Sequence, residues 1–101
     1  MYIINITTQV GIAEAEGWQA WMREAHIPEV MSTGLFTHHR MLRLLEVEET
    51  EGVTFAVQYF CNSLEAYERY KGLHAPSLHA KAAEKWGERV VSFRTLMEVI
   101  N

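Results

Sequence analysis

The residues best suited to acid–base chemistry form the short segment His26-Ile27-Pro28, at the end of a stretch with helical spacing. A proline restricts the residue before it to non-helical angles, so Pro28 is expected to kink or end the helix. That bend would hold the His26 ring in one direction near a sheet edge, where it could act as a catalytic general base. A histidine there can also cap the helix C-terminus or simply pack. Both roles stay open at the level of sequence.

Three polar side chains within apolar strands, Arg43, Gln58 and Arg94, form the second candidate group. We expect Arg43 to lie opposite Gln58. Buried polar groups need partners, so these residues could bond to each other, to Glu98 or to water inside a dimer. Alternatively they could line a ligand pocket, because arginine offers paired donors to carboxylates. Trp21 joins this candidate ligand-binding set, although tryptophans at helical core spacing more often serve packing.

The histidines do not predict a metal site. His38 and His39 are adjacent on a predicted strand, so their side chains point to opposite faces. His74 and His79 do not match the helical spacing of metal pairs, and Pro76 lies between them. Phosphate-binding and nucleophile-elbow motifs are also missing. The sequence therefore predicts no metal and no cofactor, and it leaves enzymatic activity undecided.

Composition predicts one soluble domain over residues 1–101. The net charge of −4 argues against a nucleic-acid partner, which would favour a basic face. Cys61 is the only cysteine, so an intrachain disulfide is excluded. Met1 leads directly into a strand, and apolar runs fall short of the roughly 18 residues that span a bilayer. We expect a cytoplasmic protein that does not bind membranes.

Apolar periodicity predicts the order strand, helix, strand, strand, helix, strand. The expected strands are Tyr2–Gln9, Phe36–Val47, Val53–Cys61 and Arg89–Ile100, with a hairpin connector at Glu48–Gly52. The first helix begins near Ala13, and the second opens with Asn62 as N-cap and is divided by Pro76. Right-handed crossovers place both helices on one face of an antiparallel sheet in the order 4-1-3-2. This is the ferredoxin-like α+β arrangement, βαββαβ.

The strands are apolar on both faces, which predicts a partner. We expect the richer face of each strand, such as that with Val91 and Phe93, to meet the helices. The uncovered face would then hold the following side chains: Met41, Leu45, Ala56, Phe60, Leu96 and Ile100. Leaving a large apolar side chain in water forgoes about 1.5–3 kcal/mol. A second copy presenting the same face removes this cost, so we predict a homodimer through the sheet face.

Five segments occur in a characteristic order: Trp21-Met22, His26–Met31, Arg43–Val47, Val57–Phe60 and Phe93–Val99. Together they resemble the uncharacterised bacterial family called domain of unknown function 4286, and the similarity covers essentially the whole chain. More distantly, the helix ending His-x-Pro resembles the dimeric α+β barrel group, which includes EthD-like proteins, antibiotic-biosynthesis monooxygenases and heme-degrading monooxygenases. In several of these, the cleft between helices and sheet holds a hydrophobic ligand.

The heme-degrading members use an Asn, a Trp and a His, so this resemblance can be tested residue by residue. Asn5 and either His74 or His79 could occupy two of those places. Tyr67 or Tyr70 stands where the Trp is expected, and this departure argues against heme.

Two functional hypotheses follow. The preferred one is a small homodimeric α+β barrel that binds a small hydrophobic ligand, or acts as an accessory protein, without catalysis of its own. The alternative is a cofactor-independent monooxygenase or isomerase acting on a hydrophobic carbonyl compound, with His26 as acid/base. A deep cavity with His26 opening into it would favour the enzyme, whereas His26 on the surface would favour the binding protein.

Overall fold

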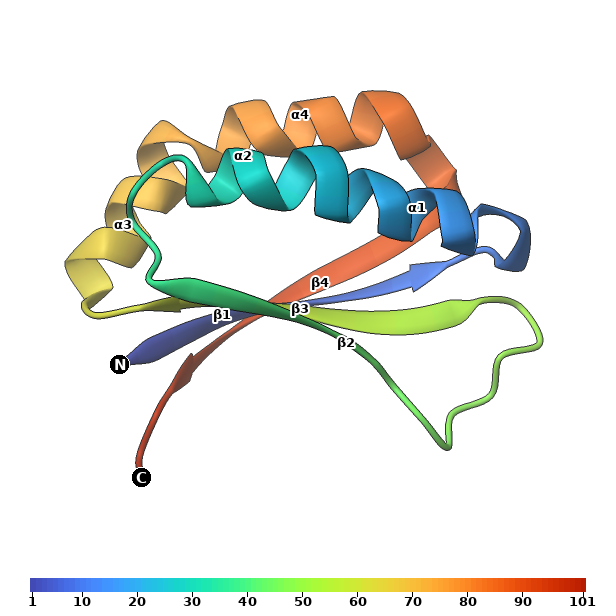
Figure 1. The fold of residues 1–101 in the computed structure, drawn as a ribbon, viewed down its shortest axis with the longest axis horizontal. Coiled ribbons are helices and arrows are strands. Elements are labelled where there is room, and N and C mark those ends of the chain that lie inside the picture. The colour runs from blue at the N-terminus through green and yellow to red at the C-terminus, as the bar shows by residue number, and fades with distance from the viewer.

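The computed structural model describes residues 1–101, with a four-stranded antiparallel sheet whose helices all lie on one face (Figure 1). The strands are β1 (Tyr2–Val10), β2 (His38–Arg43), β3 (Val53–Cys61) and β4 (Val90–Glu98). The longer helices are α1 (Ala15–Trp21), α2 (Ile27–Met31), α3 (Leu64–Leu73) and α4 (Ala75–Trp86). The strand order β2-β3-β1-β4 and the ferredoxin-like α+β class confirm the sequence prediction.

The central strands β1 and β3 match their predicted limits closely, because both are rich in β-branched and aromatic residues. The edge strand β2 is shorter than predicted and ends at Arg43. Glu46 adopts a positive φ of 59°, which breaks the extended path before the predicted end at Val47. The connector to β3 is therefore longer than the predicted Glu48–Gly52 loop, and the register of β2 shifts with it.

Pro28 does not end the first helix, contrary to the prediction. Ile27 has helical angles (φ −61°, ψ −46°), and α1 continues into α2 through a π-helical turn, Met22–His26. Pro28 has no N–H to donate to the carbonyl four residues earlier, and its ring crowds that turn. The wider turn accommodates this, since the Ile27 N–H bonds the Met22 carbonyl five residues back.

The second helical region is divided into α3 and α4 near Pro76, as predicted. The N-cap of α3 is Ser63 rather than Asn62, because the Ser63 hydroxyl accepts a hydrogen bond from the Ala66 N–H at 3.1 Å. Gly87 follows α4 with a positive φ of 56°, which favours glycine. This turn directs the chain into the edge strand β4.

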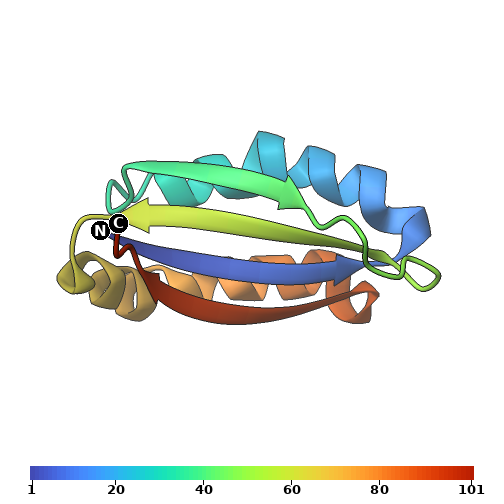
Figure 2. The same cartoon turned by 90° about the horizontal axis from the view of Figure 1, so that it is seen from below.

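The hydrophobic core fills the space between the helices and the covered face of the sheet. Ile4 and Val57 from the central strands are fully buried there, and the ring of Trp18 stacks on Phe55 with centroids 5.0 Å apart. The opposite face carries no helix (Figure 2). Alternation along the paired strands places these side chains on that open face: Ile3, Asn5, Leu42, Ala56, Gln58, Phe60, Val91, Phe93 and Met97.

Two of the predicted face assignments are wrong. In β4, Ser92 and Arg94 lie on the helix side, whereas Val91 and Phe93 lie on the open face, so Leu96 also faces the helices. In β2, Met41 is paired with Val57 and shares its helix-facing side. The error in β4 comes from assuming that the more apolar face of an edge strand must be covered. The error in β2 comes from the longer connector.

Candidate functional site

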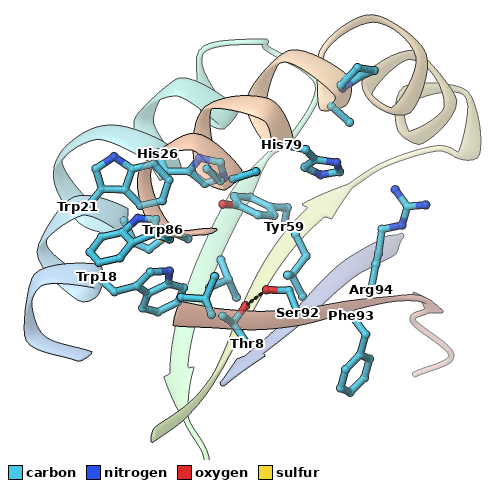
Figure 3. Close-up of a pocket in the computed structure, with 18 of the residues that line it drawn as sticks. Thr8, Trp18, Trp21, His26, Tyr59, His79, Trp86, Ser92, Phe93 and Arg94 are labelled. Atoms are coloured by element: carbon cyan, nitrogen blue, oxygen red, sulfur yellow. Dashed lines mark hydrogen bonds between the residues drawn. The ribbon is translucent and has the colours of Figure 1, made fainter. Parts of the chain in front are cut away.

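A cleft of about 570 Å³ lies between the helices and the covered face of the sheet. One end is aromatic: Trp18 and Trp21 come from α1, and Trp86 ends α4. The rings of Trp21 and Trp86 meet edge to face with centroids 5.9 Å apart. These rings form a rigid apolar wall, visible as a group in Figure 3.

His26 ends the π-helical turn and lines this cleft beside the tryptophans. Its ring stacks on Trp21 with centroids 4.9 Å apart. Burial lowers the pKa of His26, the carboxylate of Glu29 opposes this shift, and His79 adds to it. The His26 ring is therefore neutral near pH 7, the form that can accept a proton.

The opposite end of the cleft is polar and basic. His79 projects from α4 and Arg94 from β4, and Figure 3 shows both at a distance from the tryptophan group. Burial lowers the pKa of His79, and the nearby positive charge of Arg94 lowers it further. The Arg94 guanidinium lies 5.8 Å from the centre of the Tyr67 ring. Lys71 of α3 also lines the cleft.

Two polar atoms of cleft-lining residues are buried without a hydrogen-bond partner: the Tyr59 hydroxyl and the Trp86 Nε1. Burial raises the pKa of Tyr59, with a smaller contribution from Tyr70, so its phenol stays protonated. Nearby polar groups are satisfied, since the hydroxyls of Thr8 and Ser92 bond each other at 2.8 Å (Figure 3). The two exceptions are notable because buried polar groups nearly always have partners.

The candidate residues from the sequence divide into two groups. His26, Trp21 and Arg94 line the cleft together. Arg43 is paired with Phe55 instead of Gln58, so the predicted register is wrong, and its side chain is exposed and bonded to Glu49.

Gln58 also lies outside the cleft. It faces the open side of the sheet, where its amide donates to the Asn5 side chain at 3.2 Å. The predicted polar group therefore does not assemble.

Sequence reasoning did not place Tyr59 or Trp86 in a site, and it named His79 only through the distant resemblance to heme-degrading proteins. The signal for His79 was present, because it lies on one α4 stripe with Ala82, Ala83 and Trp86 at helical spacing. The sequence carries no signal that the Tyr59 hydroxyl lacks a hydrogen-bond partner.

No cluster of three or more His, Cys, Asp or Glu side chains is arranged to hold a metal ion. None of the helices has the length and hydropathy required to cross a membrane.

Solved structures share the fold of this chain at low identity. A dimeric ferredoxin-like protein from an uncultured marine organism is 11% identical, with a TM-score of 0.74 over 100% of this chain and 96% of that one. An EthD family protein from Bacillus halodurans is 10% identical, with a TM-score of 0.67 over 99% and 100%. SnoaB, a cofactor-independent oxygenase from Streptomyces nogalater, is 15% identical, with a TM-score of 0.59 over 99% and 94%.

These identities establish the fold and leave the activity open. Among curated proteins, none matches this sequence. The model of the family described as domain of unknown function, DUF4286, matches residues 1–100. The resemblance drawn from the sequence is confirmed, and the chain belongs to this family.

Proposed function

We propose that the cleft between the helices and the sheet binds a small, mostly apolar molecule. The observation that carries the proposal is the pair of buried, unpartnered polar atoms, the Tyr59 hydroxyl and the Trp86 Nε1. An unmet buried hydrogen bond costs about 1–3 kcal/mol. Indole N–H is a donor only, so Trp86 requires an acceptor, while Tyr59 can donate or accept. Both atoms are shielded from solvent in the free protein, so a ligand removes this cost where it enters deeply enough to reach them.

The size and lining of the cleft support the same proposal. Its volume of about 570 Å³ falls within the range of about 300–1,000 Å³ typical of small-molecule sites. Most of the lining is hydrophobic, with a few polar groups at separate points, the arrangement that gives a ligand both affinity and orientation.

A neutral fluorescent probe, N-phenyl-1-naphthylamine, tests this proposal. Ala83 on α4 lines the cleft, so Ala83→Trp should fill it, whereas Ala80→Trp adds the same ring on an exposed part of the same helix. We expect saturable binding to the wild type and to Ala80→Trp, and an affinity at least about tenfold lower for Ala83→Trp. Equal binding by all three proteins would exclude the cleft as the site.

Mass spectrometry under non-denaturing conditions provides the complementary measurement. We expect freshly purified wild-type protein to retain a small molecule that Ala83→Trp does not retain. Identical retained masses in both proteins would contradict a site in the cleft.

We also propose that the protein is a homodimer through the open face of the sheet. On that face Phe93 is 63% exposed and Val91 67% exposed, which is unfavourable for large apolar side chains in water. The fold relative from the uncultured marine organism is dimeric. A second copy would cover the same residues on both chains.

Sedimentation analysis tests the assembly. We expect the wild type to sediment at twice the 11.7 kDa chain mass. Phe93→Glu should sediment as a monomer, whereas Leu73→Glu, which changes an exposed leucine at the end of α3, should remain a dimer. A wild-type monomer at micromolar concentration would refute this part of the proposal.

A second candidate function is acid–base catalysis by His26 on the bound molecule. Its support is the neutral His26 ring, held against Trp21 inside the cleft. In this reaction the free ring nitrogen takes a proton from carbon next to a carbonyl, leaving an enolate, the first step for either an isomerase or a cofactor-independent oxygenase. SnoaB, a cofactor-independent oxygenase, shares the fold.

Deuterium exchange into 2-indanone, an aromatic ketone with acidic C–H groups, tests this candidate. NMR in D2O should show exchange accelerated by the wild type above buffer alone, and a loss of about a hundredfold for His26→Gln. His39→Gln, which changes an exposed histidine outside the cleft and away from the open face, serves as control. An equal rate for wild type and His26→Gln would eliminate His26 as the base.

A further inference from the structure

Charge is distributed unevenly along the cleft. The lining contains two permanent cations, Lys71 and Arg94, and no aspartate or glutamate. Both cations lie away from the tryptophan end: Arg94 is on β4 near Tyr67 of α3, and Lys71 is on α3 itself. A ligand in the cleft therefore meets aromatic rings at one end and positive charge at the other.

We propose that the ligand is an amphipathic anion whose flat apolar body lies against the tryptophans and whose acidic group is bound by Arg94 and His79. This inference rests on the proposed function, since it names the chemical class of molecule that the cleft takes. The acidic group is an oxyanion such as a carboxylate, because arginine presents paired N–H donors that match its two oxygens.

Arg94 is available for this role. The four ion pairs of the chain use Arg43, Arg69, Lys71 and Lys81, and Arg94 makes none. Its guanidinium lies over the face of Tyr67, at 5.8 Å, a contact that leaves the N–H edge of the guanidinium free for hydrogen bonds. Lys71 is a weaker candidate, because it is already paired with Glu68 at 3.2 Å.

His79 complements Arg94 from the opposite wall. The titratable and charged groups that line the cleft with it are His26, Tyr59, Tyr70, Lys71 and Arg94, and Glu29, outside the lining, is paired with Lys81. Burial and the charge of Arg94 keep His79 neutral in the free protein. An anion bound between them offsets the positive charge of Arg94, so His79 gains a proton and a second charged hydrogen bond forms.

A cationic ligand fits this site poorly. It would approach the Arg94 guanidinium, which has no carboxylate partner to offset the repulsion. The aromatic wall does not compensate, because the Trp86 ring already has two cationic neighbours, Arg89 at 5.2 Å and Lys85 at 5.6 Å. A neutral ligand would leave Arg94 without a partner of opposite charge.

A matched pair of probes tests the inference. 8-Anilino-1-naphthalenesulfonate is N-phenyl-1-naphthylamine with one added sulfonate, so the two share an apolar body and differ in charge. The measured quantity is the ratio of their dissociation constants in the dimer as purified, at low salt. The comparison uses the wild type, Arg94→Gln, and Arg69→Gln, which makes the same charge change on α3 outside the cleft.

We expect Arg94→Gln to weaken binding of the sulfonate about tenfold or more, with affinity for the neutral probe unchanged. Arg69→Gln should leave both affinities unchanged. If Arg94→Gln leaves the ratio unaltered while Ala83→Trp still blocks the neutral probe, the anionic class is wrong and the cleft remains a binding site. If neither probe responds to Ala83→Trp, the proposed function itself fails.

Discussion

The unpartnered Tyr59 hydroxyl gives a prediction that opposes the usual expectation for a core mutation. Removing a buried group ordinarily destabilises a protein, since contacts are lost. Tyr59→Phe removes only an oxygen that has no hydrogen-bond partner, while the ring keeps its packing against Phe36, whose centroid lies 5.4 Å away. The variant should therefore be more stable than the wild type in the absence of ligand.

The magnitude follows from the cost of burying that oxygen. An unsatisfied buried hydroxyl costs about 1–3 kcal/mol, so removing it stabilises the fold. The small void left behind is destabilising and cancels part of this stabilisation. We expect the free energy of unfolding to rise by about 1 kcal/mol, and the melting temperature by about 4 °C for a domain of this size.

Urea unfolding followed by far-UV circular dichroism, at one fixed protein concentration, measures the change. Tyr67→Phe is the control, because the Tyr67 hydroxyl is not one of the buried unpartnered atoms, and it should not gain stability. A loss of stability in Tyr59→Phe would mean that the hydroxyl has a partner in the free protein. The observation that carries the proposed ligand site would then be gone.

Three further predictions concern charge. Burial lowers the pKa of His26, so as the pH falls the unfolded chain binds a proton at this histidine before the folded chain does. The stability that depends on a neutral His26 is therefore complete above pH about 6.5 and declines below it. In urea titrations between pH about 7.5 and 5.5, His26→Gln should flatten this decline. When 8-anilino-1-naphthalenesulfonate binds near neutral pH, the wild type should take up protons and His79→Gln should not. Calorimetry in two buffers of different ionisation enthalpy measures this proton uptake. Equal uptake by both proteins would exclude His79 from the anion site. Arg43→Gln should leave both probe affinities unchanged in fluorescence titrations, because the Arg43–Glu49 pair lies outside the cleft.

The architecture was predictable because local signals in this chain agree. Strands β1 and β3 carry continuous β-branched and aromatic residues, Pro76 divides the second helical region, and handedness leaves few arrangements for this element order. The sequence indicated His26 as a candidate base because Pro28 was expected to kink or end the helix behind it. The reason given for it was wrong, since Pro28 widens the helix and does not end it.

The cleft itself was only partly predictable, because it depends on strand register. Arg43 was paired with Gln58 on the assumption of a short hairpin, yet Glu46 breaks β2 and leaves Arg43 opposite Phe55. A shift of one residue moves every side chain to the other face. In β4 the more apolar side, with Val91 and Phe93, is the open one, so the hydrophobic pattern indicated the wrong side.

The π-helical turn has a consequence for the length of the chain. Inward-facing residues before it follow ordinary helical steps at Ala15, Trp18 and Met22, but the next one is Ile27, one position later than such steps allow. The turn thus contains one residue more than an α-helical turn would. Deleting Ala25, an exposed member of the turn, would remove that surplus and keep both halves of the helix in phase with the sheet. Deleting one residue from α4 would instead rotate the rest of that helix by about 100° relative to the part before the deletion.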